Sequence, residues 1–280
     1  MKNLDQLEIG NAKELVLDPK HPGINDPVYC ARRKFFFNTS RAHRLAGSLS
    51  SSIDYTDEEE ALWGQVLEKL AVAHEKYASR LYLKGKQALH INEKKIPQQS
   101  EVNRLLKEMT GFGLIPAEGL LHTSSFFSYI VKHQMPCTQF LRHPAHPEYT
   151  PEPDMVHDMV GHVPFFVDHD YVEITNLIAQ GVMSAKDEKA VEKWSRVYWF
   201  AIEFSLIEEK GEIKVFGAGL LSSFGEMEYA YSSEVTRKPF HIEDVITTDY
   251  DNTQMQDLLF VIPSLPFLKK EVQRLLDGQV

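Results

Sequence analysis

The chain has 280 residues, of which 43% are hydrophobic, and its 40 acidic side chains outnumber 30 basic ones to give a net charge of −10. This composition can fill a sizeable core, and its acidic balance argues against a protein that binds nucleic-acid phosphates through clustered Lys and Arg. Only two cysteines occur, and no apolar run is long enough for a membrane span, so we expect a cytoplasmic protein without nucleic-acid or membrane partners.

The N-terminal part of the chain is predicted to hold little regular structure up to about residue 50. Turn-forming residues follow one another there, at Pro19, Pro22, Gly23 and Pro27. The short aromatic and basic run Arg32–Phe37 favours phenylalanines docked on the main body over a nucleic-acid arm, because the chain is acidic. Beyond it, Thr56 and Glu59 form a capping box that begins a long amphipathic helix, expected to end near Gly85.

Helical periodicity and stop signals predict further helices in the rest of the chain. These helices cover Ser100–Gly111, Ser124–His133, the region around His157, Tyr171–Val182 and Lys189–Glu208. The segment Gly211–Phe216 alternates between polar and apolar residues and predicts a strand. We therefore expect a single domain that is mainly α with a few short β-strands.

The segment around His157 holds the residues with the clearest chemical potential. His157 and His162 lie in an apolar run with acidic neighbours, and neutral imidazoles are common metal ligands. Their spacing of five separates the side chains by roughly 140° on an ideal α-helix, so an irregular turn is needed to bring both to one metal. The zinc-protease pattern has a spacing of four and a Glu after the first His, where this chain has Asp158. A hydrolytic zinc site is therefore disfavoured.

Glu203 is the strongest candidate for a third ligand. It stands inside the apolar and aromatic run VYWFAIEFSLI, where a buried carboxylate is costly unless it is paired or bound to a metal. The alternatives are a salt bridge to Arg196 or Arg142, or exposure to solvent. Two histidines and one carboxylate would form the facial triad of non-haem Fe(II) oxygenases, with zinc or manganese as competing metals.

Several long motifs, in order along the chain, resemble the catalytic domain of the pterin-dependent aromatic amino acid hydroxylases. The motifs are TPEPDMVHDMVGHVPFF, VYWFAIEFSLI, KVFGAGLLSSFGEMEY, GFGLIPAEGLL and CTQFLRHPAHPEYTPEPD, and HPGINDPVYCARRK is similar to the opening of the short bacterial members. The resemblance extends from about residue 20 to about residue 268. It implies an N-terminal extension at 1–20, a catalytic domain at 21–270 and a short tail at 271–280, without a regulatory or tetramerisation domain and hence a monomer.

The resemblance also implies a role for individual residues. The iron ligands would be His157, His162 and Glu203. The amino acid site would include Arg142 as the clamp for the carboxylate, together with Thr150, Pro153, Trp199 and Ser222. The pterin site would include Gly119, Leu121, Phe126 and Asp158, the last of which stands where many members have Glu.

The implied activity is a monooxygenase reaction on the ring of an aromatic amino acid. It would use Fe(II), a tetrahydropterin such as tetrahydrobiopterin, and O2, with L-phenylalanine converted to L-tyrosine as the favoured reaction. Trp199 resembles the phenylalanine and tyrosine branches more than the tryptophan branch. However, the loop Asp249–Met255, which helps to set substrate choice in the family, is more polar than expected for a phenylalanine enzyme.

Several alternatives stay open at this point. The same chemistry on tyrosine or tryptophan is one, and a zinc hydrolase with the same three ligands is a more remote one. A binding protein that has lost turnover is a third. Metal analysis separates the first two classes, and a turnover assay separates the third.

Overall fold

A computed structural model of the chain describes every residue except 1–16, 48–51, 92–94, 149 and 151. Most of the predicted N-terminal extension 1–20 therefore lies outside the described residues. The helices are α1 (Pro27–Leu45), α2 (Asp57–Tyr77), α3 (Arg80–Ala88), α4 (Gln99–Thr110), α5 (Thr123–Ile130), α6 (His169–Ser184), α7 (Glu188–Tyr198), α8 (Ala218–Leu221), α9 (Phe224–Tyr229), α10 (Ile242–Val245) and α11 (Leu265–Leu276). Two π-helical turns, Val156–His162 and Trp199–Glu203, and a 3-10 turn, Val163–Val167, complete the helical structure.

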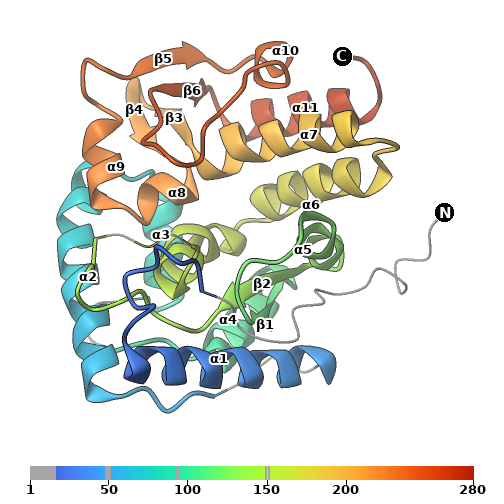
Figure 1. Ribbon diagram of the computed structural model, residues 1–280. Helices are drawn as coiled ribbons and strands as arrows, with labels where there is room; N and C mark the ends of the chain where they lie inside the picture. Colours follow the sequence, from blue (N-terminus) through green and yellow to red (C-terminus); the bar gives the residue numbers. More distant parts are fainter. Residues whose placement is uncertain (1–16, 48–51, 92–94, 149, 151) are drawn as a thin grey trace.

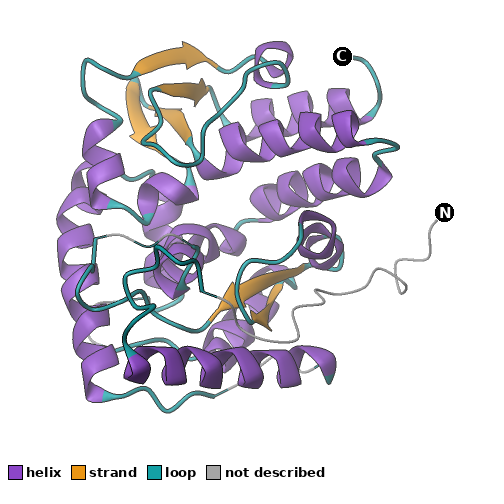
Figure 2. Cartoon of the chain, in the orientation of Figure 1, coloured by secondary structure: helices purple, strands orange, loops and turns teal. Residues whose placement is uncertain are grey.

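The strands form two small sheets among these helices (Figure 2). Strands β1 (Gly113–Ala117) and β2 (Gln134–Thr138) pair in parallel. The second sheet has the order β4-β3-β6-β5, from β3 (Ser205–Glu209), β4 (Glu212–Val215), β5 (Thr236–Pro239) and β6 (Leu258–Ile262). The prediction of a mainly α fold with a few short strands is confirmed.

The expectation of little regular structure before residue 50 is wrong, because α1 occupies most of the described part (Figure 1). Pro27, one of the turn-forming residues, occupies the first turn of α1, where a proline costs no hydrogen bond. The Asp26 side chain caps this turn by accepting from the N–H groups of Val28 and Tyr29. Phe36 and Phe37 are buried, so these phenylalanines do dock on the body of the protein.

The long helix expected from Thr56 to Gly85 is two helices. The capping box of Thr56 and Glu59 is present, but α2 ends at Tyr77. Ala78 is extended and forms a β-bridge with Val215, and the Ser79 N–H donates to the Val215 carbonyl at 3.0 Å. Pairing with strand β4 therefore interrupts a run whose apolar spacing alone favours a continuous helix.

The helix predicted over Lys189–Glu208 is also too long. Helical structure ends at Glu203, and Ser205–Glu209 is strand β3, which pairs with both β4 and β6. Sheet pairing overrides the local pattern here, as it commonly does for short apolar runs. The predicted strand Gly211–Phe216 is confirmed as β4, and the predicted stop at Gly111 is confirmed by its left-handed φ of 73°.

The core joins these elements around the turn Val156–His162. That turn packs on α8 and β2, while α6 packs on α5, α7 and α11. Helix α11 continues to Leu276, across the predicted boundary between domain and tail at residue 270. None of the helices in the described residues combines the length and apolar character needed to cross a membrane.

Candidate metal centre and ligand sites

The two predicted histidine ligands face each other across a π-helical turn. Backbone hydrogen bonds in a π-helix join residues five apart, so His157 and His162 lie over one another instead of on different faces. Their Nε2 atoms are 3.2 Å apart. The irregular turn that the spacing of five requires is therefore present.

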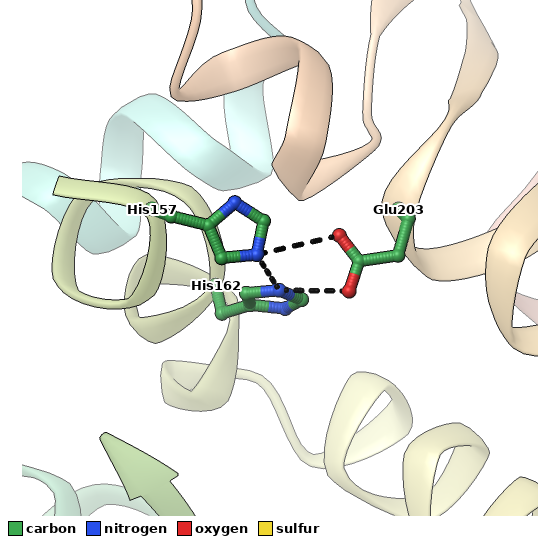
Figure 3. A group of neighbouring side chains, drawn as sticks. All are labelled: His157, His162 and Glu203. Carbon is green, nitrogen blue, oxygen red and sulfur yellow. Dashed lines mark hydrogen bonds and ion pairs between the residues drawn. The ribbon is translucent and has the colours of Figure 1, made fainter. Parts of the chain in front are cut away.

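Glu203 completes this group from a second π-helical turn (Figure 3). Its Oε1 lies 3.1 Å from His162 Nε2, and its Oε2 lies 3.6 Å from His157 Nε2. The ligand atoms of the three residues all lie within 4.8 Å of one another. The structure thus brings together the three side chains that the sequence singled out.

The alternative partners suggested for Glu203 are engaged elsewhere. Arg142 pairs with Asp154, and Arg196 pairs with Glu192 and Asp249. Glu203 is buried, and its Oε2 has no hydrogen-bond partner. The carboxylate is therefore neither exposed nor paired with an arginine.

These contacts fit a bound metal ion. The two imidazole Nε2 atoms, 3.2 Å apart, and the Glu203 oxygens converge on one point, where a cation can accept a lone pair from each of them. Ligand atoms about 2.1 Å from a metal and at right angles to one another are about 3.0 Å apart, close to the distances among these donors. Two imidazoles and one carboxylate form the donor set of the non-haem Fe(II) facial triad.

The electrostatics of the site keep the carboxylate ionised. Burial acts to raise the pKa of Glu203, but the charge and hydrogen bond of His162 and the charge of His157 lower this pKa to about 2. For His162 burial acts to lower the pKa, and Glu203 outweighs it, so the pKa is raised. An ionised carboxylate beside two imidazoles suits a divalent cation.

A hydroxyl group contacts the outer nitrogen of His157. Ser222, at the end of α8, has its Oγ 3.3 Å from His157 Nδ1 and also donates to the Gly219 carbonyl. Helix α8 lies so close to the π-helical turn that a Cβ at Gly161 would be 2.6 Å from the Ala218 carbonyl oxygen. Ser222 is thus placed to orient the His157 ring, as partners of metal-bound histidines do.

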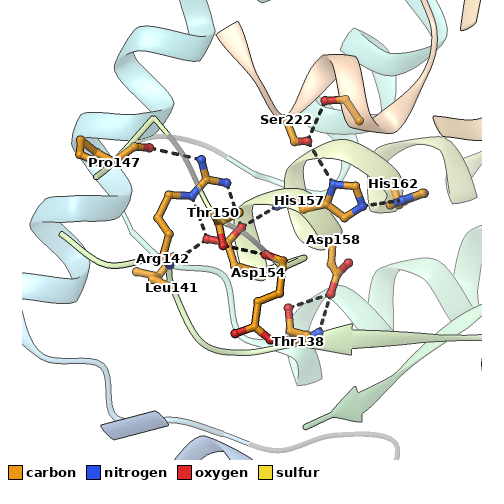
Figure 4. Close-up of polar contacts among 12 residues, drawn as sticks. Thr138, Leu141, Arg142, Pro147, Thr150, Asp154, His157, Asp158, His162 and Ser222 are labelled. Atoms are coloured by element: carbon orange, nitrogen blue, oxygen red, sulfur yellow. Dashed lines mark hydrogen bonds and ion pairs between the residues drawn. The ribbon is translucent and has the colours of Figure 1, made fainter. Parts of the chain in front are cut away.

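Arg142 and Asp154 form a buried ion pair next to this turn (Figure 4). The Arg142 Nε and Nη2 atoms donate to Asp154 at 2.9 Å each, the backbone N–H of Arg142 donates to Asp154 at 2.8 Å, and Arg142 Nη1 donates to the Pro147 carbonyl. Burial acts to raise the pKa of Asp154, but Arg142 outweighs it and the pKa is lowered. Asp154 is not among the residues predicted from the sequence, although it is the last residue of the TPEPD motif.

The other predicted residues of the amino acid site lie in two places. Thr150 donates to the Glu152 carbonyl at 2.7 Å, and Pro153 is half-buried beside Asp154. Trp199 begins the turn that ends in Glu203, stacks on Tyr250, and donates from Nε1 to Gln256 Oε1 at 3.2 Å. Gln256 is a second residue that the sequence did not reveal.

Of the predicted pterin residues, Phe126 lies on α5, Gly119 and Leu121 lie in the loop between β1 and α5, and Asp158 lies on the π-helical turn. The Phe126 ring packs edge-on against Tyr198, with centroids 5.8 Å apart, and Tyr198 stacks on His162. Gly119 follows β1 and lies close to Glu152, whose Oε2 would be 3.8 Å from a Cβ at Gly119. Leu121, in the same loop, is half-buried.

Asp158 is held by strand β2 instead of pointing to solvent. Its Oδ2 accepts from both the N–H and the hydroxyl of Thr138 at 2.7 Å. Burial raises the pKa of Asp158, against the opposing effects of the His157 charge and the Thr138 hydrogen bonds. Thr138 is a further residue that the sequence did not mark.

Comparison with known proteins gives a consistent result. The sequence model for biopterin-dependent aromatic amino acid hydroxylases matches residues 1–277. The chain is 37% identical over 261 residues to the phenylalanine-4-hydroxylase of Rattus norvegicus, covering 92% of this chain and 57% of the relative. It is 36% identical over 261 residues to the tyrosine 3-monooxygenase of the same species, covering 92% of this chain and 52% of that one. The chain thus spans little more than half the length of these relatives.

Solved structures are similar as well. The phenylalanine hydroxylase of Chromobacterium violaceum with bound oxidised Fe(III) superimposes with a TM-score of 0.77 and 28% identity, over 80% of this chain and 83% of that one. Another structure of that enzyme, with iron(III) and the oxidised cofactor 7,8-dihydrobiopterin, has a TM-score of 0.76 and 28% identity over 80% and 82% of the two chains.

Proposed function

The chain belongs to the biopterin-dependent aromatic amino acid hydroxylase family, and we propose that it is an iron- and tetrahydropterin-dependent monooxygenase that converts L-phenylalanine to L-tyrosine. The observation that carries this proposal is the convergence of His157, His162 and Glu203, with one buried oxygen of Glu203 lacking a hydrogen bond. Iron and pterin, when bound, supply the activation of O2 that no amino acid side chain can perform.

In this proposal His157, His162 and Glu203 hold Fe(II). Ser222 keeps the His157 ring oriented through Nδ1, so that Nε2 is directed at the metal. His162 and Glu203 are buried, which keeps bulk water away from the reacting atoms.

Arg142 is the proposed clamp for the carboxylate of the amino acid. A guanidinium has five N–H groups, and the side-chain bonds to Asp154 and Pro147 use three of them. The two others are available for a substrate carboxylate, a task for which the planar guanidinium is suited. Asp154 orients the group, and Thr150, Pro153, Trp199 and Ser222 are proposed to line the same site.

The pterin is proposed to bind against α5. Phe126 offers an aromatic face to the flat heterocycle, and the backbone of Gly119 and Leu121 offers hydrogen bonds to its edge. Asp158 would contact the pterin. Because its Oδ2 is held by Thr138, only the outer oxygen can face the cofactor.

Phenylalanine is the preferred substrate in this proposal, with tyrosine as the second candidate. The relatives include both a phenylalanine hydroxylase and a tyrosine monooxygenase at almost equal identity, while the cited solved structures are phenylalanine hydroxylases. A zinc hydrolase is less favoured, because the histidine spacing of five and the Asp158 after the first histidine both differ from the zinc-protease pattern.

Anaerobic reconstitution with Fe(II), followed by O2, a tetrahydropterin and each of Phe, Tyr and Trp, tests the proposal. We expect tyrosine from phenylalanine, with kcat/KM at least about tenfold above the other substrates, equivalent to about 1.4 kcal/mol. Zinc-loaded protein serves as the control and should make no product. Absence of hydroxylated product from all three amino acids would contradict the proposal.

We also propose that the protein is a cytoplasmic monomer with one catalytic domain. Both cysteines are free, which suits a reducing compartment. Among the described residues, the large exposed apolar side chains include Val28, Phe35 and Leu45 on α1, while others stand singly, for example Val72 on α2 and Met255 in a loop. Single exposed apolar residues are normal on a monomer. Light scattering during size-exclusion chromatography tests the monomer, and fractionation of the source cells tests the location.

A further inference from the structure

Gln256 connects the loop Asp249–Met255 to Trp199. Its side chain is buried, at 7% exposure, just before strand β6. Its Oε1 accepts from Trp199 Nε1 at 3.2 Å, and its Nε2 donates to the carbonyls of Asp251 and Gln254 at 2.8 Å each. One amide therefore binds the indole on one side and two backbone groups of the loop on the other.

Two aromatic rings also contact the Trp199 indole. Tyr250 stacks on it, with centroids 4.3 Å apart and planes 12° from parallel. Phe204, which directly follows Glu203, lies 4.4 Å away on a tilted plane. Stacked rings can slide and turn within their planes at little cost, whereas a hydrogen bond at the ring edge fixes the orientation.

The loop itself is closed by its own polar contacts. Asp251 Oδ1 accepts from the N–H and the hydroxyl of Thr253, and Asp249 pairs with Arg196 on α7. These contacts shape the loop and attach its first residue to α7. The hydrogen bond that joins this region to Trp199 comes from the side chain of Gln256, which directly follows the loop.

We propose that Gln256 is a positioning residue that determines substrate specificity. Its side chain fixes the orientation of the Trp199 indole and also holds the loop, so that Tyr250 stays stacked on that indole. The inference rests on the proposed function, in which Trp199 lines the amino acid site. Loss of the amide would let the indole turn and the loop move away. The site would then admit a larger ring, so discrimination between phenylalanine and tryptophan would fall.

Two variants separate the contributions of the amide. Gln256→Met keeps the size of the side chain and removes all three hydrogen bonds. Gln256→Glu keeps the acceptor for Trp199 but removes both donors to the loop. Gln254→Met is the matched control, because it removes a loop hydrogen bond, from Gln254 Nε2 to Asp251 Oδ2, while the backbone carbonyl that accepts from Gln256 stays in place.

The measurements are the dissociation constants of Phe and Trp, by calorimetry of the iron-loaded protein without O2, and hydrogen exchange of the backbone over residues 249–256. For Gln256→Met we expect the preference for Phe over Trp to fall at least about tenfold and exchange in the loop to accelerate at least about tenfold. Gln256→Glu should accelerate exchange with a smaller change in preference. Gln254→Met, which loses its bond to Asp251 but keeps the bond between Gln256 and Trp199, should leave the preference unchanged and accelerate exchange less than Gln256→Met.

The outcomes distinguish this inference from the proposed function. If wild-type protein makes no hydroxylated product while Gln256→Met alters binding preference and exchange as expected, the activity is wrong and the role of Gln256 stands. If the preference of Gln256→Met equals that of wild type, the role in specificity is overturned, whatever happens to exchange. Equal effects of the Gln254 and Gln256 variants would also overturn it.

Discussion

Two clusters of buried polar side chains lie side by side in this molecule. They differ in how many of their hydrogen-bonding groups have a partner in the protein. In the cluster of Arg142 and Asp154, both carboxylate oxygens accept two hydrogen bonds, including one from the backbone of His157. In the cluster of His157, His162 and Glu203, two imidazole nitrogens face each other and one carboxylate oxygen has no hydrogen bond.

The difference indicates what each cluster is for. A buried polar group without a partner costs about 1 to 3 kcal/mol, so an unsatisfied cluster is expected where a ligand supplies the missing contacts. The fully paired Asp154 carboxylate gives rigidity, since it holds both the Arg142 guanidinium and the first turn of the segment that carries the histidines. The following predictions test this contrast, beginning with the largest expected effect.

Glu203→Ala should abolish iron binding and reduce hydroxylation to less than about one thousandth of wild type, which is equivalent to about 4 kcal/mol. Addition of Fe(II) at 100 times its dissociation constant should stabilise wild-type protein by about 2.7 kcal/mol and leave this variant unchanged. Metal analysis and thermal unfolding with and without Fe(II) provide the measurements. Glu208→Ala, which removes an exposed carboxylate on β3, is the control, and equal iron content in both variants would exclude Glu203 as a ligand.

Asp154→Ala should lower the free energy of unfolding by about 3 kcal/mol or more, because it leaves the Arg142 charge buried and unpaired. Chemical denaturation measures this loss. The double variant Arg142→Met with Asp154→Leu should recover most of the stability, since no charge is left unpaired, while the affinity for phenylalanine stays low. A double variant as unstable as the single one would mean that the ion pair itself does not account for the loss.

His74 can be contrasted with the two histidines of the candidate metal centre in the same way. Both of its ring nitrogens have protein partners. Its Nε2 lies 2.8 Å from the Leu221 carbonyl, and its Nδ1 lies 3.3 Å from Lys86 Nζ. Burial, with help from the Lys86 charge, lowers the pKa of His74 to about 3 from 6.5. On acidification, the unfolded chain therefore binds a proton at His74 at a higher pH than the folded chain does. The contribution of neutral His74 to the free energy of unfolding is complete above pH 6.5 and is lost as the pH falls toward 3.

At pH 5 this loss amounts to about 2 kcal/mol. In His74→Phe the drop in the free energy of unfolding between pH 7 and pH 5 should be smaller than in wild type by about that amount. His241→Phe, at an exposed position, should follow the wild-type pH dependence. A drop of wild-type size in His74→Phe would show that His74 is not the group responsible.

The smallest expected effect belongs to Ser222, whose hydroxyl contacts the outer nitrogen of His157. Ser222→Ala should weaken iron binding about tenfold, as removal of a partner of a metal-bound histidine does, and should leave stability nearly unchanged. The neighbouring variant Ser223→Ala should instead lower stability and leave iron binding unchanged. Ser223 caps α9, so its loss should cost about 1 kcal/mol of stability without altering iron affinity, and a metal titration of both variants checks the pair.

The sequence revealed the candidate ligands because their residue types are rare in their surroundings. A single carboxylate in an apolar run and two histidines beside acids are conspicuous without any knowledge of the fold. Asp154, Thr138 and Gln256 are common polar residues, and their importance comes from partners that are distant in the sequence. The Trp199–Gln256 bond, for example, spans 57 positions.

The fold was predictable where local signals decide the structure and not where pairing decides it. The capping box of α2 and the glycine at the end of α4 are local, and both are confirmed. The break at Ala78 and the strand after Glu203 depend on β-strands that lie elsewhere in the chain. Helix α1 is not evident from the sequence, because a proline at the first helical position has the same residue type as one that interrupts a helix.

The π-helical turn Val156–His162 also has a consequence for protein engineering. It holds one more residue per turn than an α-helix needs, and this extra residue sets the spacing of five between the histidines. Deletion of one residue between them would leave a spacing of four, which an ordinary α-helix presents on one face. In this segment a single codon therefore separates the observed arrangement from the histidine spacing of a zinc protease.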